Sequence, residues 1–234
     1  HRRRHSFPTR RSSDLYTLLP LLIVGYFYNR WSNNKSEIAY ATTRMVIQLL
    51  LVGYVLIYIF NEKNIYLGIF ILSFMILVSS WITLRNTQNK SLSHFFKIIL
   101  SIAISNILHI ILIINFILDF DDFYEPRYVI PIAGMIIANS MNVLSLAIER
   151  FEKEYEKNKN FEETRKISFK SAMIPQINSL FAVGLVSLPG MMTGQILSGI
   201  DPLVAVRYQI MIMSTILSSA GISLILYFTF CKRI

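Results

Sequence analysis

The sequence predicts an all-α, polytopic membrane protein with about seven transmembrane helices, an external N-terminus and a cytoplasmic C-terminus. Two observations support this fold class. Of the 234 residues, 53% are hydrophobic and only 16% are charged, which is more apolar surface than one soluble core of ordinary composition hides. Apolar runs also recur at close to the length of about 20 residues that a spanning helix needs. They cover residues 45–60, 65–84, 98–118, 128–148, 181–200 and 204–230, with a shorter run at 18–28.

The first fifteen residues, HRRRHSFPTRRSSDL, are a dense basic tract without an initiator Met. They resemble translated sequencing-adaptor DNA, so we expect residues 1–15 to be an artefactual leader and leave them out of the fold reasoning. A natural basic arm or transit-type leader is the alternative. Without the leader the formal net charge falls from +9 to +5, and this moderate excess gives no reason to expect a nucleic-acid partner.

The orientation follows from the loops, because Lys and Arg collect on the cytoplasmic side of membrane proteins. Residues 30–44 and 85–97 carry three basic residues each, and residues 150–170 carry seven. The loops between them carry one basic residue each, at positions 63, 127 and 207. This alternation predicts a cytoplasmic C-terminus.

One external loop, residues 119–125, is acidic and aromatic. Its carboxylates could collect hard cations, which prefer oxygen ligands. A short charged run more often means a solvated turn, so we assign no metal site there.

Residues 149–175 form the longest polar segment, and we expect them to make a cytoplasmic hairpin. Glu162 and Lys166 have the i,i+4 spacing that supports a helix, and the apolar helix of residues 128–148 continues into this segment. Pro175 is expected to break the chain before the next helix. Such a hairpin can lie on the membrane surface, fill the space between two helices or dock on a soluble protein.

The run of residues 184–202 is apolar yet carries four glycines and two prolines. An interior Gly costs a helix about 1 kcal/mol and an interior Pro about 3 kcal/mol relative to Ala, so anchoring alone does not explain the segment. A substrate route, close helix packing or a moving joint at Pro189-Gly190 would each explain why the segment keeps these residues. Met191 and Met192 could bind a soft metal, but packing is the commoner use of Met.

Small residues recur at i,i+4 in the fifth and sixth predicted helices. Gly134 and Ala138 form one pair, and Gly190 and Gly194 form the other. Small residues let membrane helices approach closely. We therefore expect these two helices to pack through the pairs and to line a route.

Three further polar residues have plain structural interpretations. His109 could bind a metal or carry protons, but no other His, Cys or carboxylate lies within a helical turn, so interhelical hydrogen bonding is favoured. Asp201 and Pro202 read as the N-cap and first residue of the last helix. Arg207 either extends to the outer headgroups or faces an external opening between the last two helices.

Nothing in the chain supplies energy or redox chemistry. The single Cys231 forms no pair, and the phosphate-binding pattern G-x-x-x-x-G-K-[ST] does not occur in the sequence. If ATP drives this protein, the nucleotide site belongs to another subunit, and no cofactor is expected in this chain.

Several stretches together resemble the FetB-type iron-export ABC transporter permeases, from about Arg30 to the C-terminus. They are QLLLVGYVL from residue 48, VIPIAGMI from 129, VGLVSLPGMMTG from 183, GIDP from 199 and RYQI from 207. The resemblance implies one permease domain, residues 16–234, in a bacterial inner membrane. It also implies a homodimer that works with a separate ABC ATPase, which binds ATP and Mg²⁺. Iron or another metal is the implied substrate, although related plant permeases are linked to aluminium tolerance and to sugar nucleotides.

The resemblance sharpens two sets of expected site residues. The route or gate is expected at Pro131, Gly134, Asn139, Ser187, Pro189, Gly190, Met191, Met192, Gly194, Asp201 and Arg207. Coupling to the ATPase is expected at Phe161, Phe169, Ile174 and Pro175. One departure concerns the cytoplasmic segment, where residues 157–166 replace a longer region with a Gly-Ala-Thr-Pro-like turn. Either a compact hairpin serves for coupling or ATPase docking is altered.

Two other function classes remain. A gradient-driven secondary transporter or channel for cations would use the acidic external loop. An integral-membrane enzyme would need a nucleophile, a base and an acid in one place, and the sequence offers no such set.

Overall fold

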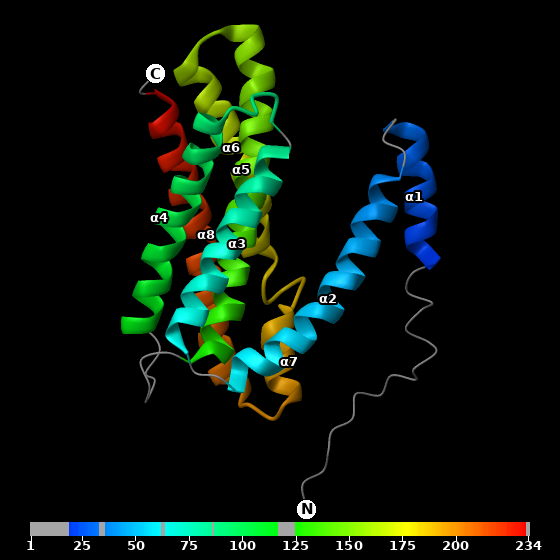
Figure 1. The fold of residues 1–234 in the computed structure, drawn as a ribbon, viewed down its shortest axis with the longest axis vertical. Helices are drawn as coiled ribbons and strands as arrows, with labels where there is room; N and C mark the ends of the chain where they lie inside the picture. Colours follow the sequence, from blue (N-terminus) through cyan, green and yellow to red (C-terminus); the bar gives the residue numbers. More distant parts are fainter. Residues whose placement is uncertain (1–18, 33–35, 62–63, 86, 117–124, 233–234) are drawn as a thin grey trace, which may run out of the picture. The chain divides into compact units, whose positions relative to one another are not determined.

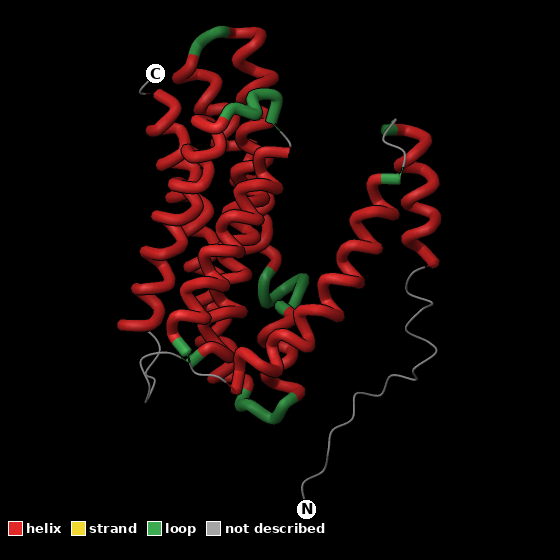
Figure 2. Tube along the Cα trace, in the orientation of Figure 1, coloured by secondary structure: helices red, strands yellow, loops and turns green. Residues whose placement is uncertain are grey.

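The computed structural model describes residues 19–32, 36–61, 64–85, 87–116 and 125–232. The described chain is almost entirely helical (Figures 1 and 2). It divides into two compact units, residues 1–62 and 63–234. The helices are α1 (Leu19–Trp31), α2 (Glu37–Asn61), α3 (Ile65–Arg85), α4 (Leu92–Phe116), α5 (Pro126–Asn158), α6 (Phe161–Ala182), α7 (Gly190–Leu197) and α8 (Pro202–Lys232).

The first unit pairs α1 with α2. The Tyr28 hydroxyl donates to a carboxylate oxygen of Glu37 at 2.7 Å, and the Ser36 amide donates to the Asn29 side chain at 3.1 Å. These bonds tie the end of one helix to the start of the next. Most side chains of α2 are exposed apolar residues, as expected for a helix that faces lipid.

The core of the second unit is the packing of α4, α5 and α8 against one another. It contains fully buried aliphatic side chains such as Ile102, Leu144 and Leu224. Hydroxyl and amide groups lie between the same helices. Small and hydroxyl side chains let helices approach where lipid offers no hydrophobic contrast.

Hydrogen bonds join α4 to its neighbours at three levels of this core. The Ser105 hydroxyl donates to the Ser219 carbonyl at 2.7 Å, and the Asn106 amide donates to Ser140 Oγ at 3.2 Å. His109 Nε2 lies 2.8 Å from Ser218 Oγ and its Nδ1 lies 2.7 Å from the Ser105 carbonyl oxygen. The interhelical role favoured for His109 is thus confirmed.

The hairpin of α5 and α6 has a two-residue link. Lys159 adopts the left-handed conformation with φ 48° and closes α5, its amide donating to the Tyr155 carbonyl. Asn160 begins α6 by accepting from the amides of Glu162 and Glu163, which is standard N-cap chemistry. α5 has 33 residues, about 50 Å at 1.5 Å per residue, so it exceeds a hydrocarbon core of about 30 Å.

The basic segments of the second unit meet at one end of its helices. Glu152 near the end of α5 accepts from the Gln88 amide of the α3–α4 link at 2.9 Å. Lys232 at the end of α8 donates to Glu162 at 2.6 Å. Figure 1 shows the α5–α6 hairpin and the end of α8 side by side.

Pro175 does not end a helix, contrary to the sequence-based expectation. It lies inside α6, which continues to Ala182. The proline ring removes one backbone hydrogen bond, and packing of α6 against α5 keeps the helix together. Tertiary contact therefore overrides the local signal.

The predicted spanning helix of residues 181–200 is also wrong. α6 ends at Ala182, whose carbonyl accepts from the amides of Val186 and Ser187 in a tight turn. Gly184 takes a φ of +83° there, which favours glycine. A short helix, α7, follows (Figure 2). The glycines and prolines interrupt the segment outright, as their helix cost would suggest.

Five described helices, α2, α3, α4, α5 and α8, are long and apolar enough to cross a membrane. With 13 and 8 residues, α1 and α7 fall short of a span on their own. The structure thus confirms an all-helical membrane fold but not a set of seven separate spans. The expected leader, residues 1–15, and the acidic loop up to Tyr124 lie outside the described residues.

The close packing of α5 predicts that a larger side chain destabilises the protein at a buried position of α5 but not at an exposed position of α2. Ala147 is fully buried in the core, and overpacking such a site usually costs about 1–3 kcal/mol. Ala147→Leu should lower the free energy of unfolding by that amount, measured by thermal melting of the purified chain in detergent. Ala41→Leu, on an exposed position of α2, is the control, and equal melting of the two variants would contradict the packing.

Candidate functional site

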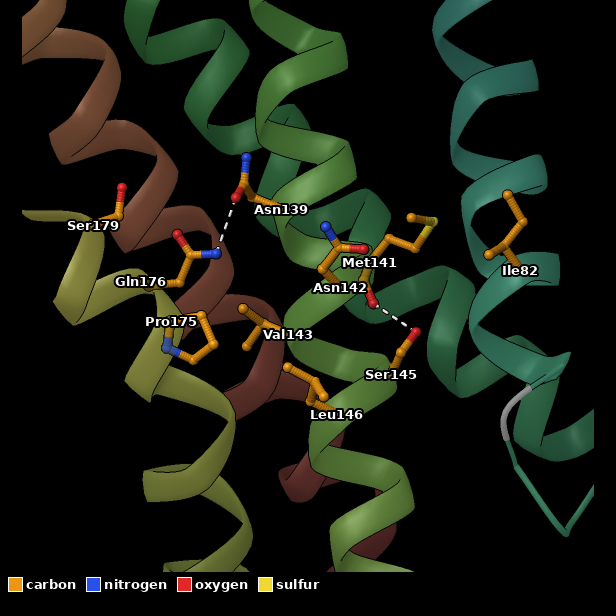
Figure 3. Close-up of a pocket in the computed structure, with 10 residues that line it drawn as sticks. All are labelled: Ile82, Asn139, Met141, Asn142, Val143, Ser145, Leu146, Pro175, Gln176 and Ser179. Atoms are coloured by element: carbon orange, nitrogen blue, oxygen red, sulfur yellow. Dashed lines mark hydrogen bonds between the residues drawn. The ribbon is translucent and has the colours of Figure 1, made fainter. Parts of the chain in front are cut away.

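A polar pocket of about 590 Å³ opens on the side of the second unit where α3, α5 and α6 meet. Figure 3 shows its lining, most of which comes from α5. The lining residues are Ile82, Asn139, Met141, Asn142, Val143, Ser145, Leu146, Pro175, Gln176 and Ser179. Half of these side chains carry an amide or a hydroxyl, in stretches of helix that are otherwise apolar.

An interhelical hydrogen bond lies at the centre of this lining. Gln176 Nε2 of α6 donates to Asn139 Oδ1 of α5 at 2.9 Å, and Figure 3 shows the two amides facing each other. The Asn139 amide nitrogen donates in turn to the Met135 carbonyl at 2.8 Å. Both polar ends of Asn139 are therefore satisfied, which holds α6 against α5 beside Pro175.

Of the other polar lining residues, Ser145 donates to the Met141 carbonyl within α5 at 2.8 Å, and the remaining two are exposed. Asn142 is exposed, and Ser179 is exposed across the pocket on α6. Polar side chains at membrane depth almost always face other protein or a water-filled cavity, because hydrocarbon offers them no hydrogen bonds. Within a membrane, Asn142 and Ser179 would therefore need protein or water in front of them.

The structure brings together only part of the expected route. Of the residues expected to form the route or gate, Asn139 lines the pocket, beside Pro175, which belongs to the set expected to couple to an ATPase. Pro131 is an exposed residue inside the first turns of α5. A Cβ atom added to Gly134 would lie 3.3 Å from Cε of Met75 in α3, so this glycine serves close packing with α3 and not with the sixth predicted helix.

The expected glycine pair in α7 has open surroundings in the part of the chain that the structure describes. Cβ atoms added to Gly190 and Gly194 would meet no atom there within 4 Å beyond their chain neighbours, so the predicted close packing of these glycines on another helix is wrong for the described chain. Pro189 is the N-cap of α7, and Ser187 closes the preceding turn by a bridge to Val183.

The methionines and the start of α8 follow the plainer expectations. Met191 packs against the hydrophobic core, and Met192 is half-buried. Asp201 accepts from the amides of Leu203 and Val204 at 2.8 and 3.3 Å, which confirms the N-cap of α8. Arg207 is exposed on that helix.

The residues expected to couple to an ATPase are divided between two places. Phe161 packs edge-on against Phe151, with ring centroids 5.4 Å apart, and Phe169 is a half-buried part of the same core. Ile174 is exposed in the middle of α6, next to Pro175 in the pocket wall. Substituting either phenylalanine would therefore disturb packing as well as docking.

An ion-pair cluster joins the hairpin to the end of α8. Glu162 accepts from Lys232 and is also paired with Arg165. The hydrogen bond from Lys232 is the main cause of a lowered pKa of the Glu162 carboxyl. A lowered folded-state pKa keeps the pair intact at neutral pH and releases it only as the pH falls through that value.

The described part of the chain holds no group of three or more His, Cys, Asp or Glu side chains arranged for a metal ion. The neutral amides and hydroxyls of the pocket can bind polar or hydrated molecules through hydrogen bonds. They do not provide the charged or imidazole ligands typical of a resident metal centre.

Gln176 and Ser179 are pocket residues that the sequence interpretation missed. A signal existed, because polar residues three apart recur in both walls, at 139 and 142 in α5 and at 176 and 179 in α6. The expected break at Pro175 concealed it, since a helical face cannot be followed across a predicted break.

Comparisons with known proteins place this architecture in a family. The profile of "Uncharacterised protein family (UPF0014)" matches residues 13–165 and 156–234. The chain is 32% identical to UPF0014 membrane protein slr1647 of Synechocystis, covering 91% of this chain and 89% of the relative. It is 34% identical to UPF0014 membrane protein YjkA of Bacillus subtilis, with 82% and 81% covered.

A further relative carries a functional name. The chain is 33% identical to the "Probable iron export permease protein FetB" of Escherichia coli, covering 85% of this chain and 82% of that protein. No solved structure matches the chain.

The bond between Gln176 and Asn139 is testable by a double-mutant cycle. We expect Asn139→Leu and Gln176→Met to show a coupling of about 0.6 kcal/mol, with about 1.7 kcal/mol as the upper range for membrane proteins. Unfolding in detergent measures it. Asn115, whose amide donates to the Ile111 carbonyl of its own helix α4, supplies the control pair, Asn115→Leu with Gln176→Met, and an equal coupling there would contradict the assignment.

Proposed function

Because the chain belongs to the UPF0014 family of membrane proteins, we propose that it is the membrane permease subunit of an ATP-driven exporter. A separate ABC ATPase powers it, and iron or another metal leaves the cytoplasm through it. The polar pocket between α5 and α6 carries this proposal, since it places amides and hydroxyls along α5, a helix long and apolar enough to cross a membrane.

The pocket supplies one wall of the route. Its open side, at Asn142 and Ser179, requires water or protein in front of it, because lipid cannot satisfy these groups. A second copy of the chain, related by two-fold symmetry, would present the same face and enclose a polar passage. A homodimer is therefore part of the proposal.

The broken segment after α6 continues this route. α6, the turn at residues 183–189 and α7 together run back along the bundle that α5 and α8 traverse in one helix each (Figure 1). Irregular backbone at membrane depth is tolerated where it lines a cavity or is buried in protein. We assign residues 183–194 to the external half of the passage.

The hairpin of α5 and α6 is the proposed contact with the ATPase. The helices reach beyond the apolar part of the bundle, and Phe151 links the hairpin to α6 and α8 through Phe161 and Phe228. Movement of the hairpin would thus be passed to the helix that carries Gln176. The two profile matches overlap at residues 156–165, which covers most of residues 157–166, the region expected to differ from FetB-type permeases.

The orientation and location complete the proposal. The α3–α4 link, the hairpin and the end of α8 are basic and lie at one end of the unit, which supports a cytoplasmic assignment for that end. Residues 126–148 then span the inner membrane of a bacterium. The proposed substrate is taken from the name of the relative from Escherichia coli. Iron is therefore the first metal to test, and a sugar nucleotide is the alternative cargo.

Blocking the pocket tests the function. Asn142→Trp should fill the route and reduce ATP-dependent export of iron from proteoliposomes that contain the chain and its ATPase to near background. Ile107→Trp, on an exposed apolar position of α4, is the control and should retain export. Equal export by both variants would contradict the assignment of the route. Export without any ATPase would favour a gradient-driven transporter.

The variant Gly190→Leu tests whether a second copy of the chain packs against this position. Among the described residues, and apart from its own chain neighbours, nothing lies within 4 Å of a Cβ atom added there, so Gly190→Leu should fold with unchanged melting. If the second copy packs on this position, the variant should lose dimers, measured by cross-linking in membranes, and should lose export with them. Normal dimers and normal export from Gly190→Leu would place the interface elsewhere.

A further inference from the structure

A second cavity lies apart from the polar pocket, in the groove between α6 and α8. Its volume is about 350 Å³. Its lining residues are Arg165, Lys166, Phe169, Ile225, Phe228 and Thr229. The α6 side contributes the two cations, and the α8 side contributes mainly apolar groups.

The groove crosses the boundary of the apolar part of the bundle. On α8 the sequence stays apolar up to Phe230, and Ile225 is a 55% exposed residue of this helix, which is long and apolar enough to cross a membrane. On α6 the charged residues extend only to Lys170. One end of the groove is therefore at headgroup level, and the other end reaches the acyl region.

The charges at the headgroup end are only partly neutralised. Glu162 is shared between Arg165 and Lys232. Lys166 is exposed and has no ion pair among the described residues. The cluster of three cations and one carboxylate keeps an excess of two positive charges beside an apolar floor.

We propose that this groove binds an anionic phospholipid, with its phosphate at Lys166 and Arg165 and the start of an acyl chain along Ile225 and Phe169. Basic pockets between helices on the cytoplasmic side suit acidic headgroups, and the apolar floor on α8 suits a chain. The two cations and the exposed Ile225 of a helix long enough to cross a membrane line the same cavity, and this pairing of positive charge with an apolar floor favours a lipid over a soluble protein.

The test measures lipid binding to the full purified chain in neutral detergent, by native mass spectrometry with phosphatidylglycerol. Lys166→Ala should weaken binding about fivefold, the value of one cation near an anionic membrane surface. Lys166→Arg should retain it. Lys157→Ala removes the same charge from the same hairpin at a site that does not line the groove, and it should change binding little.

Three results would overturn the proposal. The first is equal binding of phosphatidylcholine and phosphatidylglycerol by the unchanged protein. The second is competition by inorganic phosphate at millimolar concentration, which would indicate a free-anion site. The third is that Lys166→Ala and Lys157→Ala lose phosphatidylglycerol binding equally, or that Lys166→Ala loses capture of the ATPase in place of lipid binding. None of these measurements depends on export activity.

Discussion

The structure depends on one constraint, which is that polar groups inside hydrocarbon need partners from the protein or from enclosed water. Within α4, α5 and α8 the constraint is met largely inside the protein, since Ser105, Asn106 and His109 all bond across helix boundaries, although the buried Asn106 Oδ1 has no partner among the described residues. On the other side of α5 it is met only in part. The pair of Asn139 and Gln176 is closed, whereas Asn142 stays open. The same helix thus has a sealed structural face and an unfinished face that needs something in front of it.

The interrupted segment after α6 follows from the same constraint. A turn at residues 183–189 leaves backbone groups that a continuous helix would have bonded, and three amides return to the Ala182 carbonyl as partial compensation. Such a turn belongs beside a passage or against another chain and not against lipid. The open surroundings of Gly190 and Gly194 agree with a surface that is completed by a second copy.

Much of this fold could be predicted from sequence, because its strongest signals are local. The apolar runs, the Asp201 cap and the helical hairpin follow from residue type and spacing. The continuous α6 could not be predicted, since packing on α5 decides whether Pro175 ends a helix. Predicting the pocket from sequence required knowing that α6 continues past Pro175. Asn139 was recognisable as a polar residue in a span, but its bond to Gln176 requires knowing that both helices run past each other at that level.

The central claim is that the open face of α5 and α6 borders water inside the membrane. It is tested most directly by labelling Asn142→Cys in a Cys231→Ser background with a membrane-impermeant maleimide in inside-out vesicles. The account predicts rapid labelling that added iron, the proposed cargo, slows, and very slow labelling of Ile107→Cys on the exposed apolar face of α4. Equal, slow labelling of both positions would show that Asn142 has no access to water and would contradict the account.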